Sequence, residues 1–177
     1  MVTPILLVIP LVFAASTLAK PSSTIRELVK WVPFSEITDT TNLIAGGYEQ
    51  GLTNYVARGK VAHEYKVPQW APGKFKFNQE AYNVRIAFKG KEYVESNFEV
   101  LTGPPGATSW VAPTSLKSEP IRAGNDPATL KFLYICQARV NGLLMIGKAD
   151  DPNNDCHIPF DGTEHKSTVD FKLLVEN

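Results

Sequence analysis

The sequence predicts an all-β protein in which two tandem antiparallel β-meander repeats pack with pseudo-twofold symmetry into one compact domain. Three observations lead to this prediction: an internal repeat, segments rich in β-branched and aromatic residues, and turn signals between those segments. A small meander buries only one face, so two copies are expected to share a core.

Matching segments recur in the same order in the two halves of the chain. The clearest pairs are Trp31 and Trp110, Gly46-Gly47 and Ala123-Gly124, Tyr55 and Tyr134, Gly73-Lys74 and Gly147-Lys148, and Gly90-Lys91-Glu92 and Gly162-Thr163-Glu164. The first repeat therefore covers residues 31–101 and the second covers residues 110–175. Residues 102–109, which include two prolines and two glycines, form the linker. An insertion in the first copy, between Ala62 and Ala71, is expected at a hairpin tip because loops absorb insertions at little cost.

The strands are read most easily in the second copy. A strand over 131–140 is followed by Asn141-Gly142, a strong hairpin signal, so a second strand over 143–148 should fold back on the first. A turn cluster over 150–154 precedes a strand over 156–160, and a last strand covers 169–175. Each copy is thus expected to be a meander of four or five strands.

The N-terminal residues 1–19 have the pattern of a signal peptide. An apolar run from Pro4 to Ala15 is too short to span a bilayer, which needs about 20 residues. Small residues up to Ala19 suit a cleavage site, so the mature chain is expected to be residues 20–177, one secreted, extracellular domain. No second apolar stretch approaches the length of a membrane span.

The charge pattern argues against a nucleic-acid partner. Basic and acidic residues balance at 18 each, and no basic cluster stands out. The sequence leaves open whether the protein forms a homodimer.

The repeated elements resemble the DM-nine repeat family of arthropods and molluscs. In each copy Trp-Val is followed by a Gly-x-Asp/Glu element, a Tyr-containing strand, Gly-Lys and a Gly-x-Glu element, over Trp31 to Val175. The family includes mannose-binding lectins of molluscs and secreted insect proteins. This resemblance implies sugar contacts by Asp126 with Lys148 in the second copy and by Glu49 with Lys74 in the first. A carboxylate can accept from two sugar hydroxyls and a lysine can donate, in charge-assisted bonds.

The chain departs from the family pattern at the implied sites. Glu49 stands in place of an aspartate, the insertion lies just before Lys74, and Ile146 replaces a proline before Gly147. We therefore rank the second site above the first. Glu92 and Glu164, in the matched Gly-x-Glu elements, could orient the lysines or cap turns, and the structural role is favoured.

The two cysteines leave two readings open. Export favours a disulfide between Cys136 and Cys156. In a simple meander, however, an intervening strand separates their strands by about 10 Å, whereas a disulfide needs Cα atoms within about 7 Å. Only a different strand order or a local bend would join them.

Catalysis, metals and cofactors have little support in the sequence. Cys156 and His157 are neighbours on a predicted strand, so their side chains point to opposite faces. The three histidines lack zinc spacing. No enzyme, metal or cofactor is expected.

The favoured function is a secreted, non-enzymatic carbohydrate-binding lectin of the mannose type, acting on mannose-type glycans in innate recognition or in a salivary secretion. One alternative is a protein-interaction or structural module that retains the fold without sugar binding. Another is a carrier of a small apolar ligand, which needs an internal apolar cavity.

Overall fold

A computed structural model describes residues 28–61, 68–77, 82–126 and 128–177. The predicted signal peptide and residues 62–67 of the predicted insertion lie outside these residues, whereas the end of the insertion, from Gln69, belongs to a strand. The described part is almost entirely β-structure, which confirms the predicted all-β class. Its 3-10 helices, Phe34–Glu36 and Pro113–Ser115, are short, and no described helix is long and apolar enough to cross a membrane.

Each repeat contributes seven strands in the described part of the chain. Those of the first repeat are β1 (Lys30–Pro33), β2 (Ala45–Glu49), β3 (Leu52–Val61), β4 (Gln69–Phe75), β5 (Val84–Phe88), β6 (Lys91–Glu95) and β7 (Phe98–Thr102). Those of the second are β8 (Thr108–Val111), β9 (Arg122–Asn125), β10 (Phe132–Val140), β11 (Leu143–Ala149), β12 (Cys156–Phe160), β13 (Thr163–Ser167) and β14 (Lys172–Glu176).

The strand order departs from a simple meander at the end of each repeat. The first repeat runs β1-β7-β3-β4-β5-β6 across the sheet, so its last strand returns to lie between the first and third. The second repeat has the matching order β8-β14-β10-β11-β12-β13. The prediction of four or five strands is too low because short strands such as β8, β9 and β13 were not recognised.

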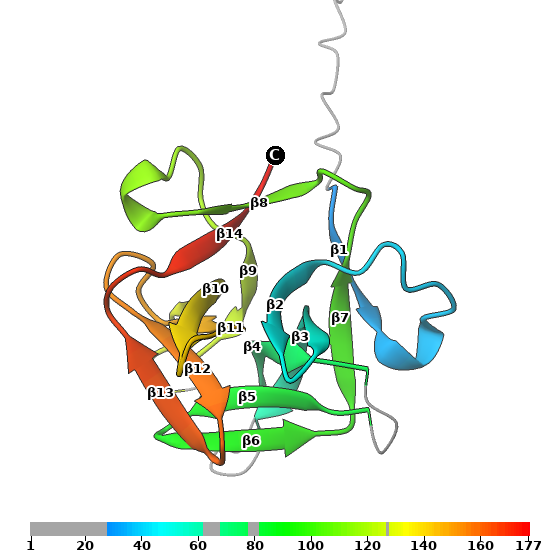
Figure 1. Cartoon of the computed structure of the whole chain (residues 1–177), viewed down its shortest axis with the longest axis horizontal. Coiled ribbons are helices and arrows are strands. Elements are labelled where there is room, and N and C mark those ends of the chain that lie inside the picture. Colours follow the sequence, from blue (N-terminus) through cyan, green and yellow to red (C-terminus); the bar gives the residue numbers. More distant parts are fainter. Residues whose placement is uncertain (1–27, 62–67, 78–81, 127) are drawn as a thin grey trace, which may run out of the picture.

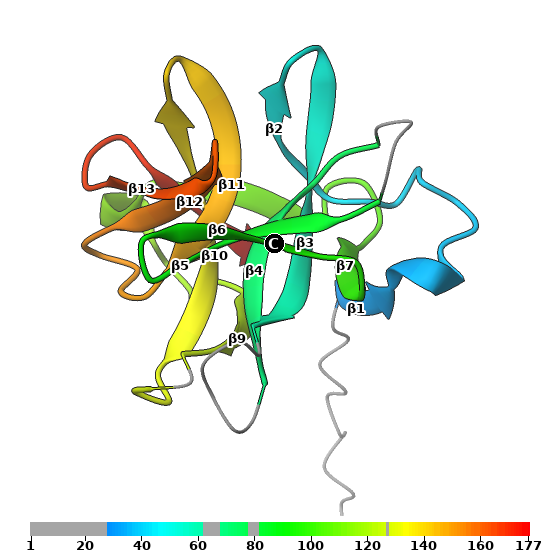
Figure 2. The ribbon, with the colours of Figure 1, turned by 90° about the horizontal axis from the view of Figure 1, so that it is seen from below.

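The two repeats are related by pseudo-twofold symmetry, as predicted. Figures 1 and 2 show the hairpins β5-β6 and β12-β13 meeting side by side between the two halves. They join through Thr163 of β13, which pairs with Lys91 of β6. Away from this junction, β2 of the first repeat also pairs with β11 of the second, through Tyr48 and Leu144.

Matched glycines permit close approach between the repeats. A Cβ atom on Gly47 would lie 2.4 Å from the carbonyl oxygen of Leu144, and one on Gly124 would lie 1.7 Å from that of Trp70. Any larger residue would push the two backbones apart. The Gly-x-Asp/Glu element of each copy is therefore a place where the backbones of the two repeats pack directly against each other.

The core between the repeats is built from both copies. One cluster combines Ile44 and Val56 of the first repeat with Ile135, Ile146 and Leu174 of the second. Trp31 and Trp110, a matched pair, are partly buried against it. Packed side chains from both repeats thus form this junction.

Cys136 and Cys156 form a disulfide, with their Cα atoms 5.8 Å apart. The expected separation of about 10 Å is wrong because β12 does not run flat beside β11: the two strands pair only between Lys148 and His157. A Cβ atom on Gly147 would lie 1.9 Å from the carbonyl oxygen of His157, so this glycine lets β12 cross close to β11 and reach β10. The local bend is the exception that the sequence reading left open.

The shared core predicts that neither repeat folds alone. Expressed separately, residues 28–105 and 106–177 should each show loss of β-structure, because each half would expose its side of the junction cluster. Circular dichroism and amide NMR dispersion of the halves, alone and mixed, would test this. Two independently stable halves with native β content would contradict the shared core.

The disulfide should contribute to stability by closing a loop between residues 20 positions apart. In the chain-entropy description, a loop of this size is worth about 3 kcal/mol. A protein carrying Cys136→Ala and Cys156→Ala should therefore show a lower urea midpoint with the same far-ultraviolet spectrum. An unchanged midpoint would show that the surrounding β-structure alone holds β12 against β10.

Candidate functional site

The first repeat brings its two predicted site residues into direct contact. Lys74 Nζ on β4 lies 2.7 Å from Glu49 Oε2 at the end of β2, and their side chains are only 2% and 7% exposed. Lys76 reaches the other carboxylate oxygen at 3.6 Å. Two lysines thus neutralise one carboxylate, and the pair is closed to solvent.

Burial and pairing act against each other on this pair. Burial raises the pKa of Glu49, but the hydrogen bond and charge of Lys74 outweigh it, so its pKa lies below the ordinary value. Burial also lowers the pKa of Lys74, although Glu49 partly restores it. Lys74 Nζ further contacts the second repeat, 3.0 Å from Met145 Sδ and 5.4 Å from the ring centre of Phe160.

The second repeat places its lysine in the same way but pairs it differently. Lys148 Nζ lies 2.5 Å from Asp150 Oδ1 and 3.6 Å from Glu164 Oε1. It also lies 5.8 Å from the ring centre of Phe88 in the first repeat. This contact mirrors the one between Lys74 and Phe160 of the second repeat. The side chain of Lys148 is 3% exposed, whereas that of Asp150 is 42% exposed. This ion pair therefore opens to solvent through its carboxylate.

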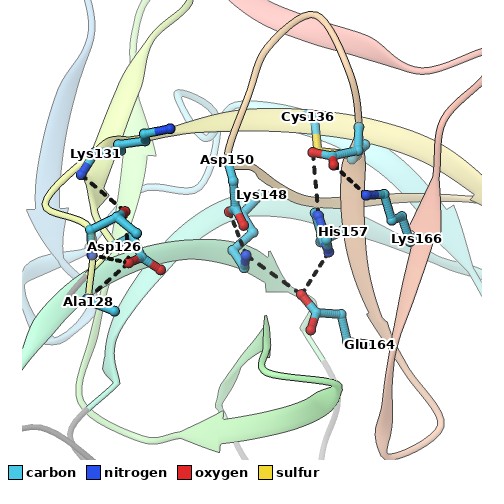
Figure 3. Close-up of polar contacts among 12 residues, drawn as sticks. Asp126, Ala128, Lys131, Cys136, Lys148, Asp150, His157, Glu164 and Lys166 are labelled. Atoms are coloured by element: carbon cyan, nitrogen blue, oxygen red, sulfur yellow. Dashed lines mark hydrogen bonds and ion pairs between the residues drawn. A yellow bond between two sulfur atoms is a disulfide. The ribbon is translucent and has the colours of Figure 1, made fainter.

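Asp126 and Lys148, which the resemblance implies as sugar contacts, do not contact each other directly. The Oδ1 atom of Asp126 accepts hydrogen bonds from the backbone N–H groups of Ala128 and Thr129, at 2.9 and 2.7 Å, and from Thr129 Oγ1 at 3.0 Å. Figure 3 shows Asp126 bonded within its own turn, while Asp150 contacts Lys148. Asp126 Oδ2 has no partner in the described part of the chain and remains an available acceptor.

The difference between the copies follows from one matched position. Because Lys74 corresponds to Lys148, Lys76 corresponds to Asp150, two residues further along and on the same face. In the first copy Lys76 is a second cation beside Glu49. In the second copy Asp150 is the carboxylate that pairs with Lys148, and Asp126 does not take part in that ion pair. The sequence reading missed Asp150, although its spacing from Lys148 could have revealed it.

Asp126 and Asp150 share the wall of an open hollow of about 200 Å³. The other residues that line it are Thr129, Lys131, Asp151, Asn154 and Asp155. The hollow thus combines carboxylates with an ammonium group, an amide and a hydroxyl. Within the described ranges, no group of three or more acidic, histidine or cysteine side chains is arranged to hold a metal ion.

Glu92 and Glu164 each bond to turns and to neighbouring strands. Each contacts the strand before its own turn: Glu92 Oε2 lies 3.1 Å from Arg85 Nη1, and Glu164 Oε1 lies 2.9 Å from His157 Nδ1. Each also accepts from a turn of the other repeat, Glu92 from the N–H of Gly162 and Glu164 from that of Gly90. The two glutamates therefore hold the repeats together, and Glu164 also contacts Lys148.

His157 contacts two carboxylates and does not form a catalytic pair with Cys156. Its Nε2 atom lies 3.4 Å from Asp155 Oδ1, and Lys166 binds the other oxygen of that carboxylate at 2.7 Å. Figure 3 shows the chain of contacts from Asp150 through Lys148, Glu164 and His157. Cys156 is in the disulfide, so it cannot act as a thiol beside His157.

These features define a tandem-repeat all-β protein with one lysine–carboxylate cluster per repeat. The chain belongs to the DM9 repeat family, whose family model matches residues 48–167. This membership supports a carbohydrate-binding or interaction module.

The fold is also similar to a solved structure, that of the nematode sperm cell motility protein MFP2B. The TM-score is 0.62 and the sequence identity 19%, over 83% of this chain and 46% of that chain. The likeness shows the fold alone, and the chain spans less than half of that protein. A search of curated proteins finds no significant match.

The buried glutamates predict acid sensitivity. Burial raises the pKa of Glu164, but the hydrogen bonds from His157 and Gly90 and the charge of Lys148 outweigh burial, so the pKa lies below its ordinary value. The pKa of Glu49 is lowered in the same way by Lys74. Because their folded-state pKa values lie below the ordinary 4.5, the stabilisation is complete above that pH and is lost as the pH falls through the folded-state values. Urea midpoints should decline below about pH 4.5.

Glu164→Gln provides the control for this acid sensitivity. Its amide oxygen can still accept from Gly90, but the group no longer titrates, so the variant should be less stable at pH 7 and should lose less stability on acidification. A parallel pH profile in the variant would exclude Glu164 as a source of the effect.

Proposed function

We propose that this protein is a secreted, non-enzymatic carbohydrate-binding protein of the mannose type, which binds sugar in the hollow of the second repeat. The observation that carries the proposal is Asp126, which lines an open polar hollow with Asp150 and Lys131 and whose Oδ2 atom has no partner among the described residues. Carboxylates that accept from adjacent sugar hydroxyls, beside a cation that donates, are a suitable donor and acceptor set for a hexose.

Lys148 has an indirect role in this proposal. Its ammonium group is buried and orients the Asp150 carboxylate, which is exposed to the hollow. A carboxylate held in place by a charge-assisted bond loses little side-chain entropy when a sugar binds. The closed Glu49–Lys74 pair offers no comparable exposed oxygen, so the second repeat is the principal site.

The wider setting of the function rests on sequence expectations. The N-terminal pattern supports export, and mannose-type glycans on cell surfaces are the natural ligands of a protein that acts in innate recognition or in a salivary secretion. Because the sequence contains no calcium-binding loop motif, we expect sugar binding to survive chelation by EDTA.

An interaction module without sugar binding is the second candidate. It is favoured by apolar side chains exposed at the β2-β3 hairpin, where Tyr48 is 57% and Leu52 36% exposed. The two candidates separate on whether the parent protein binds mannose at all.

Asp126→Asn is the sharpest test of the sugar site. Asparagine keeps the Oδ1 acceptor that holds the turn but replaces Oδ2 with an amide donor. Loss of a charged acceptor should cost about 1.5 to 3 kcal/mol, or roughly one to two decades of affinity for methyl mannoside by calorimetry. The matched Glu49→Gln variant should bind almost as well as the parent.

The outcomes of this experiment are distinct. Unchanged affinity in Asp126→Asn would place the sugar elsewhere, and a larger loss in Glu49→Gln would move the principal site to the first repeat. A parent protein that binds no mannose would favour the interaction module.

A further inference from the structure

A second hollow adjoins the proposed sugar site. It measures about 320 Å³ and shares Lys131, Asp150 and Asp151 with the polar hollow. Its remaining lining is apolar or aromatic: Leu130, Phe132, Tyr134 and Pro152. The two hollows therefore adjoin at these three charged residues and differ sharply in chemistry.

The apolar lining of the second hollow is exposed. Phe132 is 41% and Leu130 71% exposed. Leu130 adopts a positive φ of 58°, which is strained for a branched side chain. Exposed apolar groups beside a polar hollow mark a ligand surface more often than an isolated exposed side chain does.

The aromatic ring is held in place before any ligand binds. The Arg122 guanidinium lies 3.7 Å from the ring centre of Phe132 and covers one face. Arg122 is itself held by two hydrogen bonds of 2.8 Å to Glu119, which also accepts from the hydroxyl of Tyr134 at 3.1 Å. A ring fixed in this way can receive a flat apolar surface at little entropic cost.

The Phe132 ring forms an aromatic shelf that has no counterpart in the described part of the first repeat. Tyr55 and Tyr134 are matched positions, so Thr53 stands where the second repeat has Phe132. In addition, the β2-β3 turn is short, with Glu49 paired to Leu52, whereas the corresponding turn of the second repeat extends from Asp126 to Lys131. The longer turn contributes Leu130 to the apolar hollow and Asp126 and Thr129 to the polar one.

We propose that the second repeat binds an oligosaccharide of at least two hexose units, with one unit in the polar hollow and the next stacked on Phe132. This inference rests on the proposed sugar binding and specifies its ligand. The hydroxyl groups of the first unit meet the carboxylates around Asp126, and the C–H face of the second meets the aromatic shelf. Continuity through Lys131, Asp150 and Asp151 makes both contacts available to one ligand.

The test compares one sugar unit with two on the intact protein. Calorimetry should show that at least one of the α1-2, α1-3 and α1-6 mannobioses binds about three- to tenfold more tightly than methyl mannoside, the range expected for one aromatic contact. Phe132→Leu keeps an apolar side chain but removes the ring, so it should abolish this gain and leave methyl mannoside affinity unchanged. Tyr48→Leu, at an exposed aromatic residue that lines neither hollow, is the matched control and should behave as the parent.

Saturation-transfer NMR supplies a second readout. The second hexose should receive saturation in the parent and lose it in Phe132→Leu, while the first hexose retains it in both. Equal affinity for methyl mannoside and all three mannobioses would overturn the second subsite but leave the sugar site standing. An equal loss of both ligands in Phe132→Leu would overturn the division into two subsites, and a parent that binds neither would overturn both proposals.

Discussion

The structure depends on the reciprocal contact between the two repeats. Glu92 and Glu164 each bond the turn of the opposite hairpin, and their backbone N–H groups donate to the carbonyls of Gly162 and Gly90 at 3.1 and 3.2 Å. These buried carboxylates need those partners, because an unpaired buried charge is costly. The exchange therefore specifies the relative position of the halves and, with it, the placement of each lysine against the phenylalanine of the other repeat.

Duplicated positions have acquired different electrostatic roles within this frame. Lys74 and Lys148 keep the same place, but Lys76 in one copy and Asp150 in the other reverse the charge beside them. With a second cation, the carboxylate of Glu49 is sealed in a buried cluster. With Asp150 at the matched position, Lys148 pairs with this neighbouring carboxylate, and Asp126 bonds within its own turn. The two repeats therefore differ in whether their matched acidic residue pairs with the lysine.

Local chemistry made much of this arrangement predictable. The Asn141-Gly142 hairpin occurs as expected, with β10 and β11 paired from Val140 and Leu143 onwards. The matched Gly-Lys and Gly-x-Glu elements occupy equivalent strands, which follows from their conserved order along the chain. Sequence spacing could not reveal that β7 and β14 return beside earlier strands, because such pairing is set by long-range packing.

The sequence by itself determined the β class, the duplication and the hairpin turns, since these depend on side-chain periodicity and turn geometry. The candidate site residues were implied by the family resemblance. Only the tertiary structure decided how those residues are connected. The sharp crossing at Gly147 joins Cys136 to Cys156, and Lys148 pairs with Asp150 while Asp126 bonds within its own turn. Both outcomes depend on backbone approach and on competition between nearby partners in three dimensions, which linear spacing does not encode.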